Sequence, residues 1–244
     1  EGQPNLDCDL IILNTAMGHS FIDLLSEAHK LSPDAQIVGC TCGGVIGREG
    51  PNESLKALAI MAIKGPKNEF AVSGLESSIL VDPYTSGFQL AQNLRDKNKG
   101  INLILLYPCA MLKDFDSLIA GIESVFGKDI PIIGGASIDG KLISDFQFFG
   151  KKIVEKSAVI VGFADASIEL ISHATLGADI KGEPLEVTRS DANCVFELDG
   201  KNAWECLMDK LGMPFSSSAL EMITVATLAK EIPGKLYKEY DSKY

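Results

Sequence analysis

The chain contains one short pattern twice, and this repeat constrains the fold more than any other feature. Each copy starts with an aliphatic run, continues through an amphipathic stretch and ends in a second apolar run that closes on glycine. Leu10 and Leu103 are 93 residues apart in the first runs, and Gly39 and Gly134 are 95 residues apart at the closing glycines. Short aliphatic runs predict strands, and apolar residues at helical spacing predict amphipathic helices. We therefore expect two pseudo-symmetric strand–helix–strand units.

The remaining apolar segments extend both units. The runs expected to form strands are 9–15, 35–39, 55–63, 69–75, 101–107, 130–134, 142–150, 157–163 and 167–173. The stretches expected to form helices begin after Ser20, after Asp82, before Phe115 and after Gly200, and the last spans 216–231. Continuous apolar runs joined by amphipathic helices are typical of parallel strands covered by helices. We expect an α/β fold, with α+β as the alternative, in which mixed sheets are covered by helices and 55–63 pairs with 69–75 as a hairpin.

Charge and cysteine usage exclude several classes of protein. The chain has 22 Lys and Arg against 33 Asp and Glu, a net charge of −11, which opposes binding to nucleic acid or to anionic lipid. Its apolar runs are far shorter than the roughly 20 residues of a membrane-spanning helix. We find no secretory signal. The six cysteines form no C-x-x-C pair, which favours reduced thiols and predicts a cytoplasmic protein.

The first glycine turn is a candidate ligand site. Gly39, Cys40, Thr41, Cys42 and Gly43 follow a strand that we expect to be parallel, so they would lie at the carboxyl edge of the sheet, where open α/β folds bind ligands. Glycine lets a ligand approach the backbone closely. A tight turn into a hairpin explains the same residues equally well. The spacing matches neither G-x-G-x-x-G nor a P-loop, so we predict no nucleotide site.

The second glycine turn supplies the other half of the predicted site. Gly134, Gly135 and Ala136 follow the equivalent strand, and Asp139 lies shortly after them. The Asp139 carboxylate is placed either to meet a ligand amine or to cap a turn before glycine. A small ligand between the two halves would contact both turns.

Metal or haem binding is an alternative hypothesis. Cys40 and Cys42 share a face of an extended segment, but structural zinc takes four ligands, and His19 would add only one. Small buried cysteines are the more ordinary explanation. His29 falls near a helix end, where a cation suits the dipole. His173, at a strand end, is a candidate haem ligand, although a lone histidine there is more often structural.

The sequence holds no recognisable catalytic set. It lacks the nucleophile elbow G-x-S-x-G and the zinc motif H-E-x-x-H. We therefore predict that the protein is not an enzyme, with Cys40 as a nucleophile as the alternative. A scaffold that binds another protein domain is a further alternative.

In order and spacing, several stretches resemble the FIST family, a sensory domain named from F-box and intracellular signal transduction proteins. The stretches that carry the resemblance are Ile37–Gly43, Ile130–Gly140, Phe148–Lys152, Ser157–Val159, Val187–Thr188 and Val195–Ala203. The resemblance implies a cytoplasmic input module that binds small ligands, including amino acids or their derivatives, and accompanies a signalling output domain. It predicts no obligatory cofactor.

The resemblance also suggests domain limits and a haem alternative. It predicts a FIST N-terminal-type domain over 9–190, with the duplication at 9–80 and 101–175, and the incomplete start of a C-terminal-type region over 191–244. The last ten residues begin what looks like a new element, so we expect a piece of a longer protein. Some relatives resemble haem-binding nitric-oxide sensors. Many members carry His-Gly where this chain has His173 and Ala174.

Overall fold

The described part of the chain divides into two compact units. The computed structural model describes residues 7–139, 144–172, 180, 182–191, 194–223, 226, 228–231 and 234. The first unit is Glu1–Leu170 and the second is Ile171–Tyr244. Helices and mixed sheets occur together, which confirms the predicted α/β class.

The first unit contains two sheets. The five-stranded sheet has the order β10-β9-β2-β1-β5, and the four-stranded sheet has the order β6-β11-β7-β8. The strands of the first sheet are β1 (Leu10–Thr15), β2 (Gln36–Thr41), β5 (Leu58–Ile63), β9 (Phe146–Phe149) and β10 (Lys152–Glu155). The strands of the second sheet are β6 (Phe70–Gly74), β7 (Leu103–Pro108), β8 (Ile132–Gly134) and β11 (Ala158–Phe163). A small hairpin, β3 (Val45–Gly47) and β4 (Gly50–Asn52), lies outside both sheets.

Each sheet contains one of the two predicted units. β1 pairs in parallel with β2, and β7 pairs in parallel with β8. An antiparallel strand lies on the other side of each pair, β5 beside β1 and β11 beside β7. The helices that join the parallel strands are α1 (Phe21–Leu31) and α3 (Phe115–Phe126). The two local units thus share their strand order, while pseudo-symmetry of the whole domain stays a prediction.

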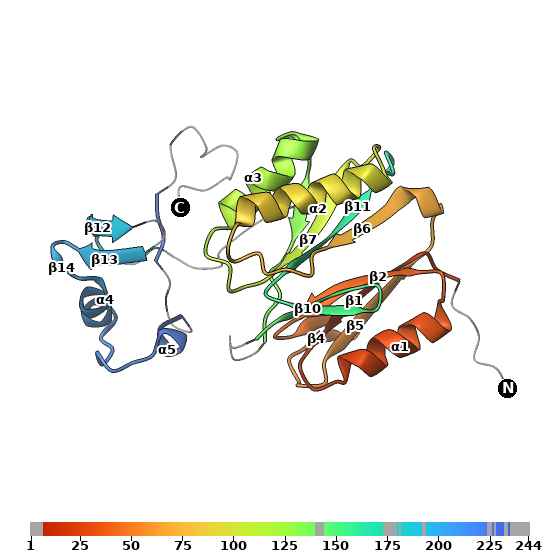
Figure 1. The fold of residues 1–244 in the computed structure, drawn as a ribbon. Coiled ribbons are helices and arrows are strands. Elements are labelled where there is room, and N and C mark those ends of the chain that lie inside the picture. The colour runs from red at the N-terminus through yellow and green to blue at the C-terminus, as the bar shows by residue number, and fades with distance from the viewer. Residues whose placement is uncertain are drawn as a thin grey trace. The chain divides into compact units, whose positions relative to one another are not determined.

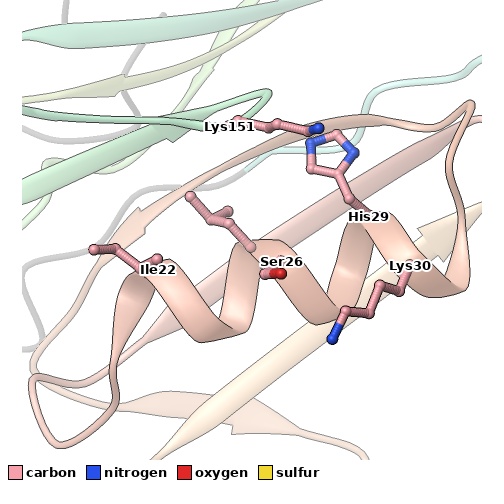
Figure 2. Close-up of a pocket in the computed structure, with 6 residues that line it drawn as sticks. Ile22, Ser26, His29, Lys30 and Lys151 are labelled. Atoms are coloured by element: carbon pink, nitrogen blue, oxygen red, sulfur yellow. The ribbon is translucent and has the colours of Figure 1, made fainter.

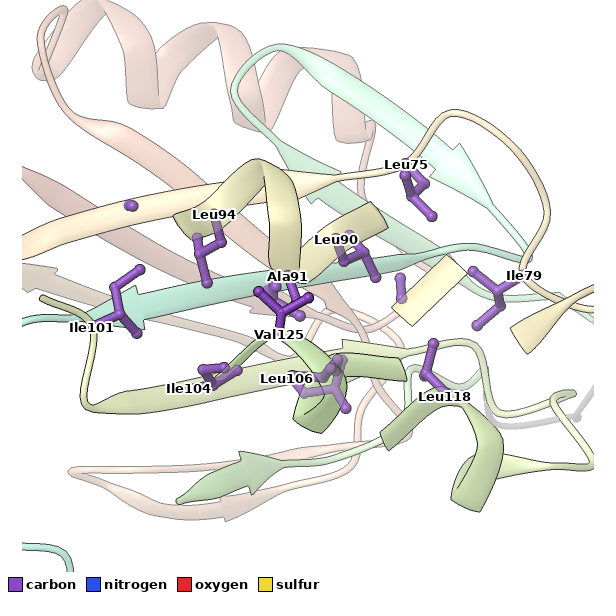
Figure 3. Packing of buried hydrophobic residues seen from close by; sticks show 14 of the residues in the cluster. Leu75, Ile79, Leu90, Ala91, Leu94, Ile101, Ile104, Leu106, Leu118 and Val125 are labelled. Atoms are coloured by element: carbon purple, nitrogen blue, oxygen red, sulfur yellow. The ribbon is translucent and has the colours of Figure 1, made fainter. Parts of the chain in front are cut away.

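The first unit has four layers, with an apolar cluster between each layer and the next (Figure 1). Leu10, Ile12 and Val38 of the first sheet pack against Val72 and Val159 of the second, so the sheets lie face to face. Helix α1 covers the outer face of the first sheet. Helices α2 (Pro83–Lys97) and α3 cover the outer face of the second sheet (Figure 3). The order of layers is helix, sheet, sheet, helices.

Glycine sets how helices α2 and α3 meet. A Cβ on Gly87 would lie 2.1 Å from the carbonyl oxygen of Leu118, and a Cβ on Gly121 would lie 2.2 Å from that of Tyr84. The two backbones therefore touch directly. Tyr84 and Phe88 of α2 are 48% and 42% exposed, although their helical spacing in the sequence predicts that they are buried.

The predicted hairpin of 55–63 with 69–75 is wrong, because the chain changes sheets between these strands. β5 pairs with β1 in the first sheet, whereas β6 pairs with β11 in the second. Gly65, Pro66 and the short 3-10 helix Lys67–Glu69 carry the chain across. β9, which follows β8 in sequence, returns and pairs with β2. The first sheet thus takes β9 and β10 from the second half of the sequence, and the second sheet takes β6 from the first half. We call this arrangement the strand exchange.

The second unit contains a small sheet and short helices. Its elements are β12 (Val187–Asp191), β13 (Cys194–Leu198), β14 (Lys201–Asn202), α4 (Ala203–Leu211) and α5 (Ala219–Ile223). The helix expected after Gly200 is confirmed as α4. The strand expected at 167–173 is not formed by residues 167–172, and His173 falls outside the described residues. In the part of the chain that the structure describes, no helix has the length and apolar character to cross a membrane.

Candidate functional site

The repeated glycines lie within the parallel sheets, where they allow neighbouring strands to approach. Gly39 pairs with Leu13, and Gly134 pairs with Leu106. A Cβ on Gly39 would lie 1.7 Å from the carbonyl oxygen of Leu13, and a Cβ on Gly134 would lie 1.9 Å from that of Leu106. Real Cβ contacts are never this short. Strand packing therefore explains these two glycines without a ligand, and β2 continues past Gly39 to Thr41.

The segments that follow the two parallel pairs nevertheless come together. The Ile138 N–H donates a hydrogen bond of 3.1 Å to the Thr41 carbonyl. A Cβ on Gly43 would lie 3.9 Å from Cγ2 of Ile138, which is ordinary contact. The Cys42 N–H donates to the carbonyl of Thr15 at the end of β1. Both predicted turns therefore form one surface at the carboxyl ends of the parallel strands.

The predicted site residues differ in how far solvent reaches them. Gly43, Gly134, Gly135 and Ala136 are exposed and Cys42 is half-buried, whereas the side chains of Cys40, Thr41 and Asp139 are buried. A ligand would thus reach the backbone of these turns more easily than those three side chains.

Two of the buried side chains hold neighbouring backbone. Oγ1 of Thr41 accepts a hydrogen bond of 2.9 Å from the Phe146 N–H. Oδ2 of Asp139 accepts a bond of 3.3 Å from the Ser144 N–H. Thr41 and Asp139 therefore support the backbone around the site and are not exposed to a ligand in it.

A buried polar network lies beneath the turns, and the sequence analysis did not find it. The amide nitrogen of Gln147 donates to the hydroxyl of Ser137 and, at 2.9 Å, to Oδ1 of Asp145. Its amide oxygen accepts from the Ser157 N–H at 3.1 Å. Oδ2 of Asp145 accepts from the Ala110 N–H at 3.1 Å. Gln147 thus links β9 of the first sheet to segments that flank β7, β8 and β11 of the second.

The ends of the two repeated first strands also meet. Tyr107 makes a side-chain hydrogen bond with Asn14, and Sγ of Cys40 donates to Oδ1 of Asn14 at 3.5 Å. Burial raises the pKa of Tyr107, and the bond with Asn14 offsets part of that rise. Asn14 and Tyr107 each follow an aliphatic run at equivalent places in the repeat, so the repeat contained a signal for this contact.

The thiols near the turns are held in their protonated form. Burial raises the pKa of Cys40 strongly, and the nearby Cys42 and Asp145 raise it further. Burial also raises the pKa of Cys42. Burial, with a hydrogen bond to Asp145, raises the pKa of Cys109 to about 12. Because the thiolate is the nucleophile and the metal ligand, this environment opposes both alternative roles of Cys40.

The predicted metal ligands do not come together within the described residues. Among these residues, no group of three or more His, Cys, Asp and Glu side chains could hold a metal ion. Nε2 of His19 lies 3.0 Å from the Lys56 carbonyl oxygen, with which it hydrogen-bonds. The haem hypothesis depends on His173, which lies outside the described part of the chain.

Two cavities of the first unit lie away from the predicted turns. The residues that line a cavity of about 360 Å³ beside α1 are Ile22, Leu25, Ser26, His29, Lys30 and Lys151 (Figure 2). The residues that line a cavity of about 410 Å³ beside β6 and α2 are Val72, Ser73, Gly74, Asn93, Asp96, Lys97 and Phe149. Neither contains a residue of the predicted ligand site.

Comparison with known families identifies the domain. The family model of the FIST N domain matches residues 9–201, which is well over half of the chain. No curated protein is similar enough to the chain to match it. The match includes both strand–helix–strand units, both glycine turns and the buried network between them. The chain therefore belongs to the FIST family of sensory and signal-transduction domains.

Proposed function

We propose that this FIST domain is a cytoplasmic sensor that binds a small polar molecule of the amino-acid class between its two glycine turns. Binding is read out by a signalling output domain or protein. The domain works by recognition and not by catalysis, and it uses no cofactor, nucleic acid or membrane.

The observation that carries the proposal is the contact between two exposed turns. The bond from Ile138 to Thr41 holds the turns together, and Gly43 and Ala136 expose backbone on either side of it. The N–H groups of Gly43 and Ala136 make no hydrogen bond with any residue that the structure describes. Backbone N–H donors on small, exposed residues are suited to the carboxylate of an amino acid.

The buried network gives the site a path to the rest of the domain. Ser137 belongs to the second turn, and Gln147 connects it to Ser157 at the start of β11. A ligand that shifts the second turn would alter bonds that join the two sheets. A ligand shifts a conformational equilibrium only if it contacts the two states differently, so we propose that it contacts the second turn differently when these bonds are made and when they are broken.

A thermal-shift screen of the twenty amino acids tests the proposal. A ligand that binds only the folded state must raise the melting temperature. The variants Gly43→Leu and Gly135→Leu add a bulky side chain to each turn without a clash, since their Cβ positions meet only Ile138 or nothing within 4 Å. Gly47→Leu, whose Cβ also meets nothing within 4 Å, is the matched control.

We expect at least one amino acid to stabilise the parent and the Gly47→Leu variant but neither Gly43→Leu nor Gly135→Leu. Equal stabilisation of all four proteins would place the ligand elsewhere. If no amino acid stabilises the parent, and haem reconstitution gives a Soret band, the haem hypothesis replaces this proposal.

A further inference from the structure

The cavity beside α1 combines a basic wall with an apolar wall. His29 and Lys30 lie in the last turn of α1, and Lys151 lies in the turn between β9 and β10. Figure 2 shows the side chains of Lys151 and His29, which both line the cavity, pointing toward each other. The Gly150 N–H donates a hydrogen bond of 2.8 Å to the carbonyl of Ile37 on β2, and this bond fixes the turn to the first sheet.

His29, which lines this cavity, carries an unsatisfied polar atom that is shielded from solvent. Its Nε2 is buried and has no hydrogen-bond partner within the described chain. A buried polar atom without a partner costs about 1–3 kcal/mol, so native structures rarely retain one without a water, ion or ligand. In the tautomer that carries a proton on Nε2, this atom needs a hydrogen-bond acceptor.

The charges around the cavity are not balanced. Lys30 forms an ion pair with Glu27 on the same helix. Lys151 forms no ion pair with the residues that the structure describes. No Asp or Glu lines the cavity. An ammonium group and an imidazole therefore face the same space with no carboxylate of the protein between them.

The apolar part of the lining, which lies one to two turns before His29 on the same face of α1, determines which anion fits. Ile22 and Leu25 lie on the same face of α1, and Ile22 is 72% exposed although it is a large aliphatic side chain. The volume of about 360 Å³ falls at the lower end of the range for small-molecule sites. A carboxylate group would meet the basic wall while a short alkyl chain covers Ile22.

We propose that this cavity is a second ligand site, which binds a small organic carboxylate with a short apolar tail through His29 and Lys151. It is separate from the site between the glycine turns and does not depend on it.

Hexanoate is a suitable probe for the full chain. Its binding can be measured by calorimetry and by the ring resonances of the histidines in NMR spectra. Two further probes separate the parts of the proposal, since 1-hexanol has the tail without the charge and inorganic phosphate has the charge without the tail. The test variants are Lys151→Gln and His29→Gln. The matched controls are Lys128→Gln, at an exposed position, and His19→Gln.

We expect hexanoate to shift the His29 resonances and to bind more tightly than either other probe. Losing one charge-assisted contact should weaken binding roughly tenfold in each test variant and leave both controls unchanged. Ile22→Glu, which adds a carboxylate at an exposed position of the wall, should abolish binding without threatening the fold.

Three results would overturn the proposal. Hexanol binding as tightly as hexanoate would reduce the site to an apolar groove, and phosphate binding as tightly would remove the role of the tail. Equal losses in Lys151→Gln and Lys128→Gln would mean that only net charge matters.

Discussion

Gln147 is the side chain on which the buried network depends, so replacing it with methionine is the sharpest test of the structure. The side chain is fully buried and makes three hydrogen bonds, to Ser137, Asp145 and the Ser157 N–H. Methionine has a similar length and volume and no strong hydrogen-bonding group. Gln147→Met therefore removes the three bonds without opening a cavity.

The loss can be estimated from the groups left behind. A buried N–H without a partner costs about 1–3 kcal/mol, and a lost bond to a carboxylate costs about 1.5–3 kcal/mol. The Ser137 hydroxyl loses one donor but still bonds to the Pro108 carbonyl at 3.0 Å. Since the added apolar burial offsets part of the loss, we expect the free energy of unfolding to fall by about 3–5 kcal/mol. For a domain of this size, that lowers the melting temperature by roughly 10 °C.

Urea unfolding followed by circular dichroism measures this change, with Gln92→Met as the control. Gln92 makes a comparable bond of 2.8 Å to Asp96, but on the solvent side of α2. Surface changes of this kind stay within about 0.5 kcal/mol. If Gln147→Met also stays within 1 kcal/mol of the parent, the network does not join the sheets and the path proposed for signalling fails with it.

Three further changes test other parts of the structure. Gly39→Ala should lower the urea midpoint sharply, because its Cβ would lie 1.7 Å from a carbonyl oxygen. Gly47→Ala, whose Cβ meets nothing within 4 Å, should not lower it. Equal midpoints in the two variants would contradict the close approach of the strands. Iodoacetamide at pH 8, followed by mass spectrometry, should label the exposed Cys194 well before Cys40, because burial raises the pKa of Cys40. Equal labelling of the two cysteines would show that Cys40 is accessible. Hydrogen bonds from the hydroxyl and the N–H of Ser117 lower the pKa of Asp114. The stabilising effect of Asp114 is therefore present above its unfolded pKa and is lost as the pH falls through its folded pKa. Asp114→Ala should lower the urea midpoint at pH 7 and match the parent once the pH is below that folded pKa.

The local order of the fold could be predicted from the sequence because it depends on local periodicity. The aliphatic runs that start at Leu10 and Leu103 became parallel strands, each joined to its partner through an amphipathic helix. Ser20 and Asp82 accept from the first turn of their helices, as residues of these types do at helix starts. These features need information from only a few neighbouring residues.

Strand partners could not be predicted in the same way. β5 and β6 follow each other closely, and a short polar segment with glycine and proline is the usual signal for a hairpin. Nothing local distinguishes a hairpin from a chain that crosses to the facing sheet. The partner of β6 is β11, nearly ninety residues further on, and only the apolar surface of that distant strand decides the pairing.

The candidate site shows the same limit at the level of single residues. Glycine at position 39 is equally compatible with a ligand and with a neighbouring carbonyl, and the structure shows the carbonyl. Gln147 gave no signal at all, because a glutamine between phenylalanines reads as the solvent side of a strand. Gln147 is buried because the second sheet packs on the first, and no residue near Gln147 in the sequence indicates this packing.

The strand exchange implies that neither half of the first unit is complete without the other. Residues 1–100 contain β6 but lack its partner β11, and residues 101–244 contain β9 but lack its partner β2. Separated, the first half would leave β6 unpaired, and the second would leave β9 and β11 each without one neighbour. Both halves would expose the apolar face that now lies between the sheets. This predicts that two halves of a duplicated sequence do not fold as two domains.

Fragments 1–100 and 101–170, produced separately, should therefore show no cooperative urea transition, and mixing them should restore one. The Gly39→Ala variant of the first fragment serves as the control, because it should fail to complement for the same reason that it destabilises the intact chain. A cooperative transition in fragment 1–100 alone would show that β6 finds another partner. In that case each half would be stable alone, and the strand exchange would not be what joins the two sheets into one folding unit.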